Sequence, residues 1–234
     1  PGKGIYMSET SSDVLVEHSS FFECGYNAIY FHGNNITVKN NFIDTFCFVK
    51  DDGGGIYTFT GPANTTFTNR KIINNIIVNG IGAVPGTKPY GANDFPYVEG
   101  IYLDLFANGI EIEGNTIADV KSKGIFVNNS RNVSITNNKI YNTGYSVFFT
   151  SDYTDNLTRN ITMKNNEFLN KGSNQAHIYV RSKVNTLGGM GTFDHNVYSR
   201  PINESNTISL QTPGKNGLID LQTWKADYGL DKNS

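Results

Sequence analysis

Apolar and polar residues alternate in short segments that recur along the whole chain. Each segment usually has a small residue, then Ile or Val, an aromatic residue and an apolar residue, as in Gly100-Ile-Tyr-Leu. The copies begin at Gly4, Ala28, Gly55, Gly100, Gly124, Ser146 and His177, with a weaker copy at Thr207. Their spacing indicates a repeat of about 23 residues that insertions lengthen. Such alternation is typical of a half-buried strand, so we expect one β-strand at each copy.

A second short segment follows most copies and contains a turn whose second residue is always Asn. These residues are Asn41, Asn75, Asn115, Asn138, Asn166 and Asn196. Asn tolerates the left-handed backbone of a tight turn, and stacked Asn amides can hydrogen-bond from one repeat to the next. We therefore interpret the six residues as a structural ladder with no catalytic role.

Both patterns predict an all-β fold, a right-handed single-stranded parallel β-helix of about eight coils over residues 1–219. In this fold each coil stacks on the next at about 4.8 Å and buries the apolar face of its neighbour. Residues 220–234 follow, with an acidic residue at Asp220, apolar residues at helical spacing (Leu221, Trp224, Tyr228) and Gly229. This segment predicts a short helix and tail that cap the last coil.

The two faces of the predicted first strands differ. One face is apolar apart from Thr58 and should form the core. The other carries a column of aromatic residues that we expect to be exposed: Tyr6, Tyr30, Tyr57, Tyr102, Phe126, Phe148 and Tyr179. An exposed aromatic column beside polar groups is unusual on a soluble protein, and it would suit the apolar faces and hydroxyl edges of a sugar chain.

The amino-acid composition limits the classes of molecule that this protein is expected to bind. The 234 residues carry a formal net charge of -2, without the concentrated Lys/Arg surface that nucleic acid requires. No apolar run approaches the roughly 20 residues of a membrane span. We therefore expect a carbohydrate partner, no nucleic acid and no membrane, while the sequence does not indicate the number of subunits. Because the first residues already lie within a repeat, we also expect the chain to be part of a longer protein.

Acidic residues and loop insertions gather around the third and fourth coils. Residues 59–70 and 80–98 form the insertions, which we expect to be the walls of a site. Glycosidic hydrolysis needs one protonated and one ionised carboxyl group across the bond. Asp52 and Asp104, from adjacent coils, are the predicted catalytic pair, with Asp51 and Glu99 as competitors that otherwise bind substrate. The sequence does not show which carboxyl is the acid, or whether the reaction retains or inverts configuration.

Further side chains on the outward face complete the predicted binding surface. Tyr57, Tyr102 and Asn128 lie beside the acids in the repeat alignment. His32 either binds a hydroxyl or tunes a carboxylate, or it is a plain surface histidine. Arg181, several coils away, either holds a remote sugar carboxylate or is simply solvated.

The order Asp-Gly-Gly-Gly-Ile-Tyr-Thr at 52–58, Asn-Asn-Ile-Ile at 74–77 and Gly-Ile-Tyr-Leu-Asp at 100–104 resembles bacterial β-helix glycoside hydrolases of the α-L-fucosidase and xylanase type. The segment from Trp224 to Ser234 also resembles the end of their helical domain. The resemblance implies paired catalytic carboxylates on neighbouring coils, here Asp52 and Asp104, and a plant or algal polysaccharide or oligosaccharide as substrate. The size of such substrates implies an extracellular or periplasmic location. No cofactor or metal is expected.

Two other functions compete with hydrolysis. A polysaccharide lyase would cleave uronates with a Lys or Arg base and a cation that is often calcium. A calcium site made by Asp51, Asp52 and Glu99 would favour this alternative. A carbohydrate-binding or adhesin β-helix without catalysis would present the aromatic column without a convergent pair of acids.

Overall fold

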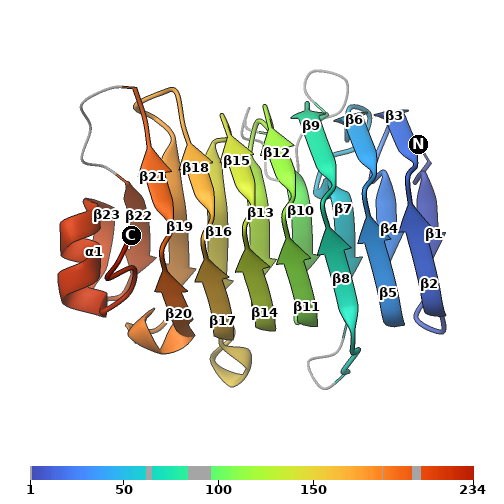
Figure 1. Ribbon diagram of the computed structural model, residues 1–234. Helices are drawn as coiled ribbons and strands as arrows, with labels where there is room; N and C mark the ends of the chain where they lie inside the picture. Colours follow the sequence, from blue (N-terminus) through green and yellow to red (C-terminus); the bar gives the residue numbers. More distant parts are fainter. Residues whose placement is uncertain (1, 62–64, 84–95, 186, 202–206) are drawn as a thin grey trace.

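The computed structural model describes residues 2–61, 65–83, 96–185, 187–201 and 207–234, which form a solenoid of three sheets (Figure 1). Parts of both predicted wall insertions, residues 62–64 and 84–95, lie outside the described residues. Among the described residues, no helix is long and apolar enough to cross a bilayer.

Three strands alternate around each coil. The first sheet contains β1 (Ile5–Met7), β4 (Ile29–Phe31), β7 (Gly53–Phe59), β10 (Val98–Asp104), β13 (Lys123–Asn128), β16 (Tyr145–Ser151), β19 (Ala176–Ser182) and β22 (Ile208–Thr212), with β23 (Lys215–Ile219) antiparallel at its end. The second contains β2 (Ser12–Glu17), β5 (Asn34–Lys39), β8 (Arg70–Ile73), β11 (Asn108–Glu113), β14 (Arg131–Thr136), β17 (Arg159–Lys164) and β20 (Gly191–Asp194). The third contains β3 (Ser20–Cys24), β6 (Phe42–Phe46), β9 (Ile76–Gly80), β12 (Thr116–Ala118), β15 (Lys139–Tyr141), β18 (Glu167–Leu169) and β21 (Val197–Ser199). The parallel strands of the first sheet confirm the prediction of about eight coils.

Equivalent residues of successive coils lie directly above one another. In the first sheet Ile29 pairs with Ile56, Ile56 with Ile101 and Ile101 with Ile125. All four are fully buried. Burying a side chain of this size contributes about 1.5–3 kcal/mol relative to leaving it exposed, so each coil is stabilised mainly by the coils on either side.

The predicted Asn ladder is present and continuous. Asn41, Asn75, Asn115, Asn138 and Asn166 each donate an Nδ2 hydrogen bond of 2.9–3.0 Å to Oδ1 of the next ladder residue, ending at Asn196. The same Oδ1 atoms accept the backbone N–H of the preceding ladder residue, as in Asn115 to Asn138 at 2.9 Å. One detail of the prediction is wrong: the left-handed residue is the first of each turn, such as Asn74 with φ 53°, and not the ladder residue that follows.

A short helix follows β23, as predicted. Helix α1 (Leu221–Tyr228) begins after Asp220, whose carboxylate accepts the Thr223 N–H at 2.7 Å, and ends at the left-handed Gly229. The side chain of Trp224, on the inner face of this helix, is fully buried. Beyond the helix, the buried Asp231 accepts hydrogen bonds from Asn196 Nδ2 at 2.8 Å and Trp224 Nε1 at 3.0 Å. The tail therefore joins the ladder and closes it.

We expect Asn138→Ala to lower the free energy of unfolding by about 3 kcal/mol or more, because it leaves several buried backbone and amide groups without partners. Urea unfolding of the variant measures the effect. Asn216→Ala, at an exposed position of β23, is the matched control and should change stability by about 0.5 kcal/mol or less. Equal losses in the two variants would show that the ladder is not a major source of stability.

Candidate functional site

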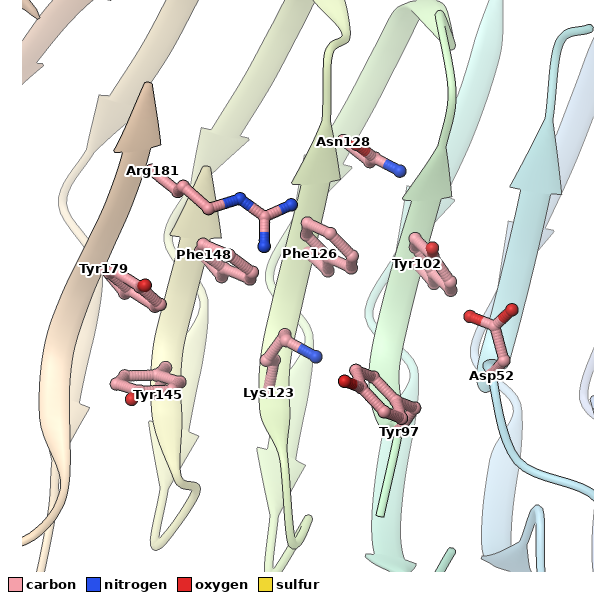
Figure 2. A pocket seen from close by; sticks show the side chains of 10 residues that line it. All are labelled: Asp52, Tyr97, Tyr102, Lys123, Phe126, Asn128, Tyr145, Phe148, Tyr179 and Arg181. Atoms are coloured by element: carbon pink, nitrogen blue, oxygen red, sulfur yellow. The ribbon is translucent and has the colours of Figure 1, made fainter. Parts of the chain in front are cut away.

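A hollow of about 620 Å³ opens on the outward face of the first sheet. Its lining residues are Asp52, Tyr97, Tyr102, Lys123, Phe126, Asn128, Tyr145, Phe148, Tyr179 and Arg181. Figure 2 shows Asp52 at one end, Tyr179 and Arg181 at the other, and a row of rings between them. Four of the nine site residues predicted from the sequence line the hollow: Asp52, Tyr102, Asn128 and Arg181.

A break in strand alternation brings Glu99 and Lys123 to the outward face. A Cβ built on Gly100 would lie 2.6 Å from Cγ2 of the core residue Ile117, so this glycine faces inward although its neighbour Ile101 is also buried in the core. Gly124 has the same environment in the next coil. With two consecutive inward residues, the residue before each glycine turns outward, and Glu99 pairs in register with Lys123. Strict alternation overlooks Lys123; the Gly-Ile sequence in each strand was the signal available.

The aromatic column forms the floor of the hollow. The ring pairs Tyr102–Phe126, Phe126–Phe148 and Phe148–Tyr179 are stacked, with centroids 4.4–4.7 Å apart and interplanar angles of 7–15°. The prediction of an exposed column is wrong for this part, since Tyr102, Phe126 and Phe148 are buried against one another. Both faces of Phe126 and of Phe148 are covered by neighbouring rings. These two rings therefore turn mainly their edges to the hollow and are not platforms for stacking a sugar.

Asp52 lies in the loop that leads into β7. Its backbone is left-handed, with φ 57°, and its N–H donates to the Tyr97 carbonyl at 2.7 Å. The residue is exposed, and the partial desolvation of its carboxyl beside the hollow raises its pKa. The negative charge of Asp104 adds to this rise. Asp52 therefore stays protonated to a higher pH than an ordinary aspartic acid does.

Asp104 ends β10 and is held by three donors. The Tyr57 hydroxyl donates to Oδ2 at 2.6 Å, while Asn128 Nδ2 and the Leu105 N–H donate to Oδ1, each at 2.8 Å. Donors of this kind complement a negative carboxylate and fix its orientation. Asp104 is half-buried and is not among the lining residues of the hollow, which it contacts through its hydrogen bond with Asn128. Tyr57 is buried, so its contact with the site is through Asp104.

Glu99 and Lys123 form a buried ion pair, with Nζ 2.6 Å from Oε1. Burial raises the pKa of Glu99 to about 7, although the positive charge of Lys123 opposes the rise. Glu99 Oε2 is buried and has no hydrogen-bond partner in the described part of the chain. Glu99 therefore acts on the hollow through Lys123, whose ammonium lines it.

Asp51 and His32 lie away from the hollow. Asp51 is buried, and its Oδ2 accepts the Tyr97 N–H at 3.3 Å. His32 is also buried, with its ring centroid 6.4 Å from that of Phe59 and 6.5 Å from that of Phe67, so the alternative of a plain surface histidine is wrong. Burial lowers the pKa of its imidazole. Neither side chain contacts the hollow, so the predicted binding roles have no support in the geometry.

Arg181 stands at the far end of the hollow from Asp52 (Figure 2). Its Nε and Nη2 donate to one oxygen of Asp152 at 2.9 and 2.7 Å, and its Cζ lies 5.6 Å from the centroid of Phe148. The side chain is exposed and also ion-paired, so the structure leaves open whether Arg181 is solvated or holds a sugar carboxylate. Over the described ranges, no group of three or more His, Cys, Asp or Glu side chains is arranged to hold a metal ion.

Three sheets wound in this way define a parallel β-helix protein with a candidate site on one face. The chain belongs to the right-handed β-helix family, whose model, described as the right handed beta helix region, matches residues 1–189. This match is to the fold family as a whole and does not distinguish the α-L-fucosidase and xylanase type. No curated protein matches the chain significantly.

One solved structure with some similarity is the A-module of a mannuronan C-5 epimerase from Azotobacter vinelandii. The TM-score is 0.35 and the sequence identity 14%, over 86% of this chain and 56% of that one. The chain thus spans little more than half the length of that structure.

We expect Lys123→Met to be destabilising by about 3–5 kcal/mol at pH 8, because it leaves the Glu99 carboxylate buried without its partner. The loss should be smaller at pH 5: the pKa of Glu99 is already raised to about 7 beside Lys123, and at pH 5 the carboxyl is neutral. Urea unfolding at the two pH values measures the difference. Lys139→Met, which removes an exposed ion pair, is the control, with about 1 kcal/mol or less lost at either pH. A loss of unfolding free energy that is the same at both pH values would contradict the raised pKa of Glu99.

Proposed function

We propose that this protein is a glycoside hydrolase that binds a plant or algal polysaccharide or oligosaccharide in the hollow and cleaves it with Asp52 and Asp104. The observation that supports this most directly is the contrast between two carboxyls on neighbouring coils. Asp52 has a raised pKa, whereas Asp104 accepts hydrogen bonds from Tyr57 and Asn128. Pairs of carboxyls with different environments are the usual means of glycosidic hydrolysis.

The contrast supports one division of roles within this proposal. Asp52 donates its proton to the glycosidic oxygen as the bond to the anomeric carbon breaks. Asp104, oriented by Tyr57 and Asn128, either attacks that carbon or takes a proton from the attacking water. Tyr102 and Asn128 line the hollow near these groups and would contact the sugar. An α-L-fucosidase or xylanase type of activity, and an extracellular or periplasmic location, are parts of the same proposal.

The lyase alternative has one observation in its favour, the presence of Lys123 in the hollow. A lyase base must approach a substrate proton with a free lone pair. Nζ of Lys123 is instead engaged as a donor, to Glu99 Oε1 at 2.6 Å and to Ser122 Oγ at 2.9 Å. Hydrolysis by carboxylates is therefore the better account of the same residues.

Asp52→Asn and Asp104→Asn should each lower kcat/KM by at least about 100-fold, the usual effect of losing a general acid or base. Release of reducing sugar from a panel of plant and algal polysaccharides measures activity. Asp227→Asn, an exposed acid on α1, is the matched control and should retain full activity. Activity that survives both site substitutions would reject the pair, and an ultraviolet absorbance of unsaturated product would identify a lyase instead.

The pH dependence should report the state of Asp52. A raised pKa means that the folded protein holds this proton to a higher pH than an ordinary aspartic acid, at about 3.9. A general acid works only while protonated, so kcat/KM should fall as pH rises through that raised value. We expect the alkaline limb of the wild-type profile to lie above the range of an ordinary aspartic acid, and an alkaline limb within that ordinary range would contradict the role of Asp52.

A further inference from the structure

Two cationic side chains approach the same ring in the floor of the hollow. Lys123 Nζ lies 5.6 Å from the centroid of Phe148 and 5.0 Å from that of Phe126. Arg181 Cζ also lies 5.6 Å from the centroid of Phe148. Figure 2 shows the Lys123 ammonium on one side of the row of rings and the Arg181 guanidinium on the other, reaching in from β13 and β19. The space above Phe148 is therefore flanked by two positive charges.

The rings between these charges add to the positive potential. An aromatic ring is negative on its faces and positive at its edge. The faces of Phe126 and Phe148 are covered by their stacked neighbours, so their positive edges are turned to the hollow. Such a floor suits an oxygen-rich or anionic group better than the apolar face of a sugar.

Both cations retain hydrogen-bonding capacity. An ammonium has three donors, and Lys123 uses one on Glu99 and one on Ser122 Oγ at 2.9 Å. Arg181 spends Nε and Nη2 on Asp152, and across the described residues its Nη1 has no hydrogen-bond partner. The Arg181–Asp152 pair is at the surface, where an ion pair is worth about 1 kcal/mol or less, so an incoming anion can compete for the guanidinium.

We propose that Lys123 and Arg181 form an anion-binding subsite that takes a carboxylate or sulfate group carried by the bound glycan. The inference rests on the proposed function in that the ligand is a sugar. It extends that function by naming the class of sugar: one with an acidic substituent, seated between β13 and β19 and away from the carboxyl pair.

Glu99 sets the strength of this subsite. The charged groups that act on Glu99 are Lys123, Asp52 and Asp104. The nearby Cys47 thiol and Tyr102 hydroxyl both have a pKa raised well above the usual range and are neutral. As pH falls through about 7, the pKa of Glu99, its carboxyl takes up a proton and no longer neutralises Lys123. Affinity for an anionic sugar should therefore increase as pH falls from 8 to 6.

Calorimetric binding to the Asp52→Asn variant, which would not consume the ligand, tests the subsite. Two matched probe pairs are used: an oligogalacturonate with its methyl ester, and a sulfated carrageenan oligosaccharide with its desulfated form. At least one acidic member should bind about 10-fold or more tightly than its neutral partner, which corresponds to one charge-assisted hydrogen bond. The pair that shows the preference identifies carboxylate or sulfate as the group.

Variants in the same background separate charge from folding. Arg181→Gln, at an exposed position, should lower the ratio of the affinities for the acidic and neutral probes by about 10-fold. The affinity for the neutral probe should not change. Asp152→Asn, which removes the ion pair of Arg181, should increase the affinity for the acidic probe. Glu99→Gln should abolish the change in affinity between pH 8 and 6, with thermal unfolding as the check that the variant is folded.

The outcomes distinguish this inference from the proposed function. Equal binding of acidic and neutral probes in both pairs, or equal loss of both probes in Arg181→Gln, would overturn the subsite. Turnover of neutral glycans by the wild-type protein would then leave the hydrolase proposal intact. A clear preference for acidic probes, without turnover of any glycan by the wild-type protein, would reject the hydrolase and retain the subsite.

Discussion

Hydrogen bonding between equivalent positions of successive coils is the constraint on which the rest of this structure depends. The Asn amides fix each coil over the next, so every outward side chain lies next to its counterparts one strand spacing away. A site on such a scaffold is built from columns of side chains that occupy equivalent positions in successive coils. The hollow is composed in this way: an aromatic column supplies the floor, and the column that holds Glu99, Lys123 and Tyr145 supplies one wall.

The same columns explain why the site is electrostatically coupled. Asp52, Glu99, Lys123 and Asp104 come from three consecutive coils, and each carboxyl with a raised pKa owes part of its shift to the others. A charge placed in one coil is therefore felt in the next, about 4.8 Å away. Substitutions in this cluster should not be additive, since neighbours in one network rarely are.

Much of the fold follows from the sequence because its period is short and its columns are chemically distinct. The Asn ladder, the stacked Ile core and the helix after Asp220 each come from residue types that have one good environment in a solenoid. The arrangement of the site was harder to predict from the sequence. Strict alternation concealed the outward turn of Lys123, which follows from the inward packing of Gly100 and Gly124. Ring orientation also has no signature in sequence, so aromatic residues expected to be exposed proved to be buried by one another.

The ladder has a direction, because every hydrogen bond between its side chains is donated toward the C-terminal end of the solenoid. An Asn at its end would present an unused donor to whatever strand came next. Asp231 stands there instead, and its carboxyl oxygens accept hydrogen bonds from Asn196 Nδ2 and Trp224 Nε1. The last amide donor of the stack, that of Asn196, is therefore satisfied by a buried carboxyl of the tail and is not left as an unpaired polar group at the edge of the final ladder rung.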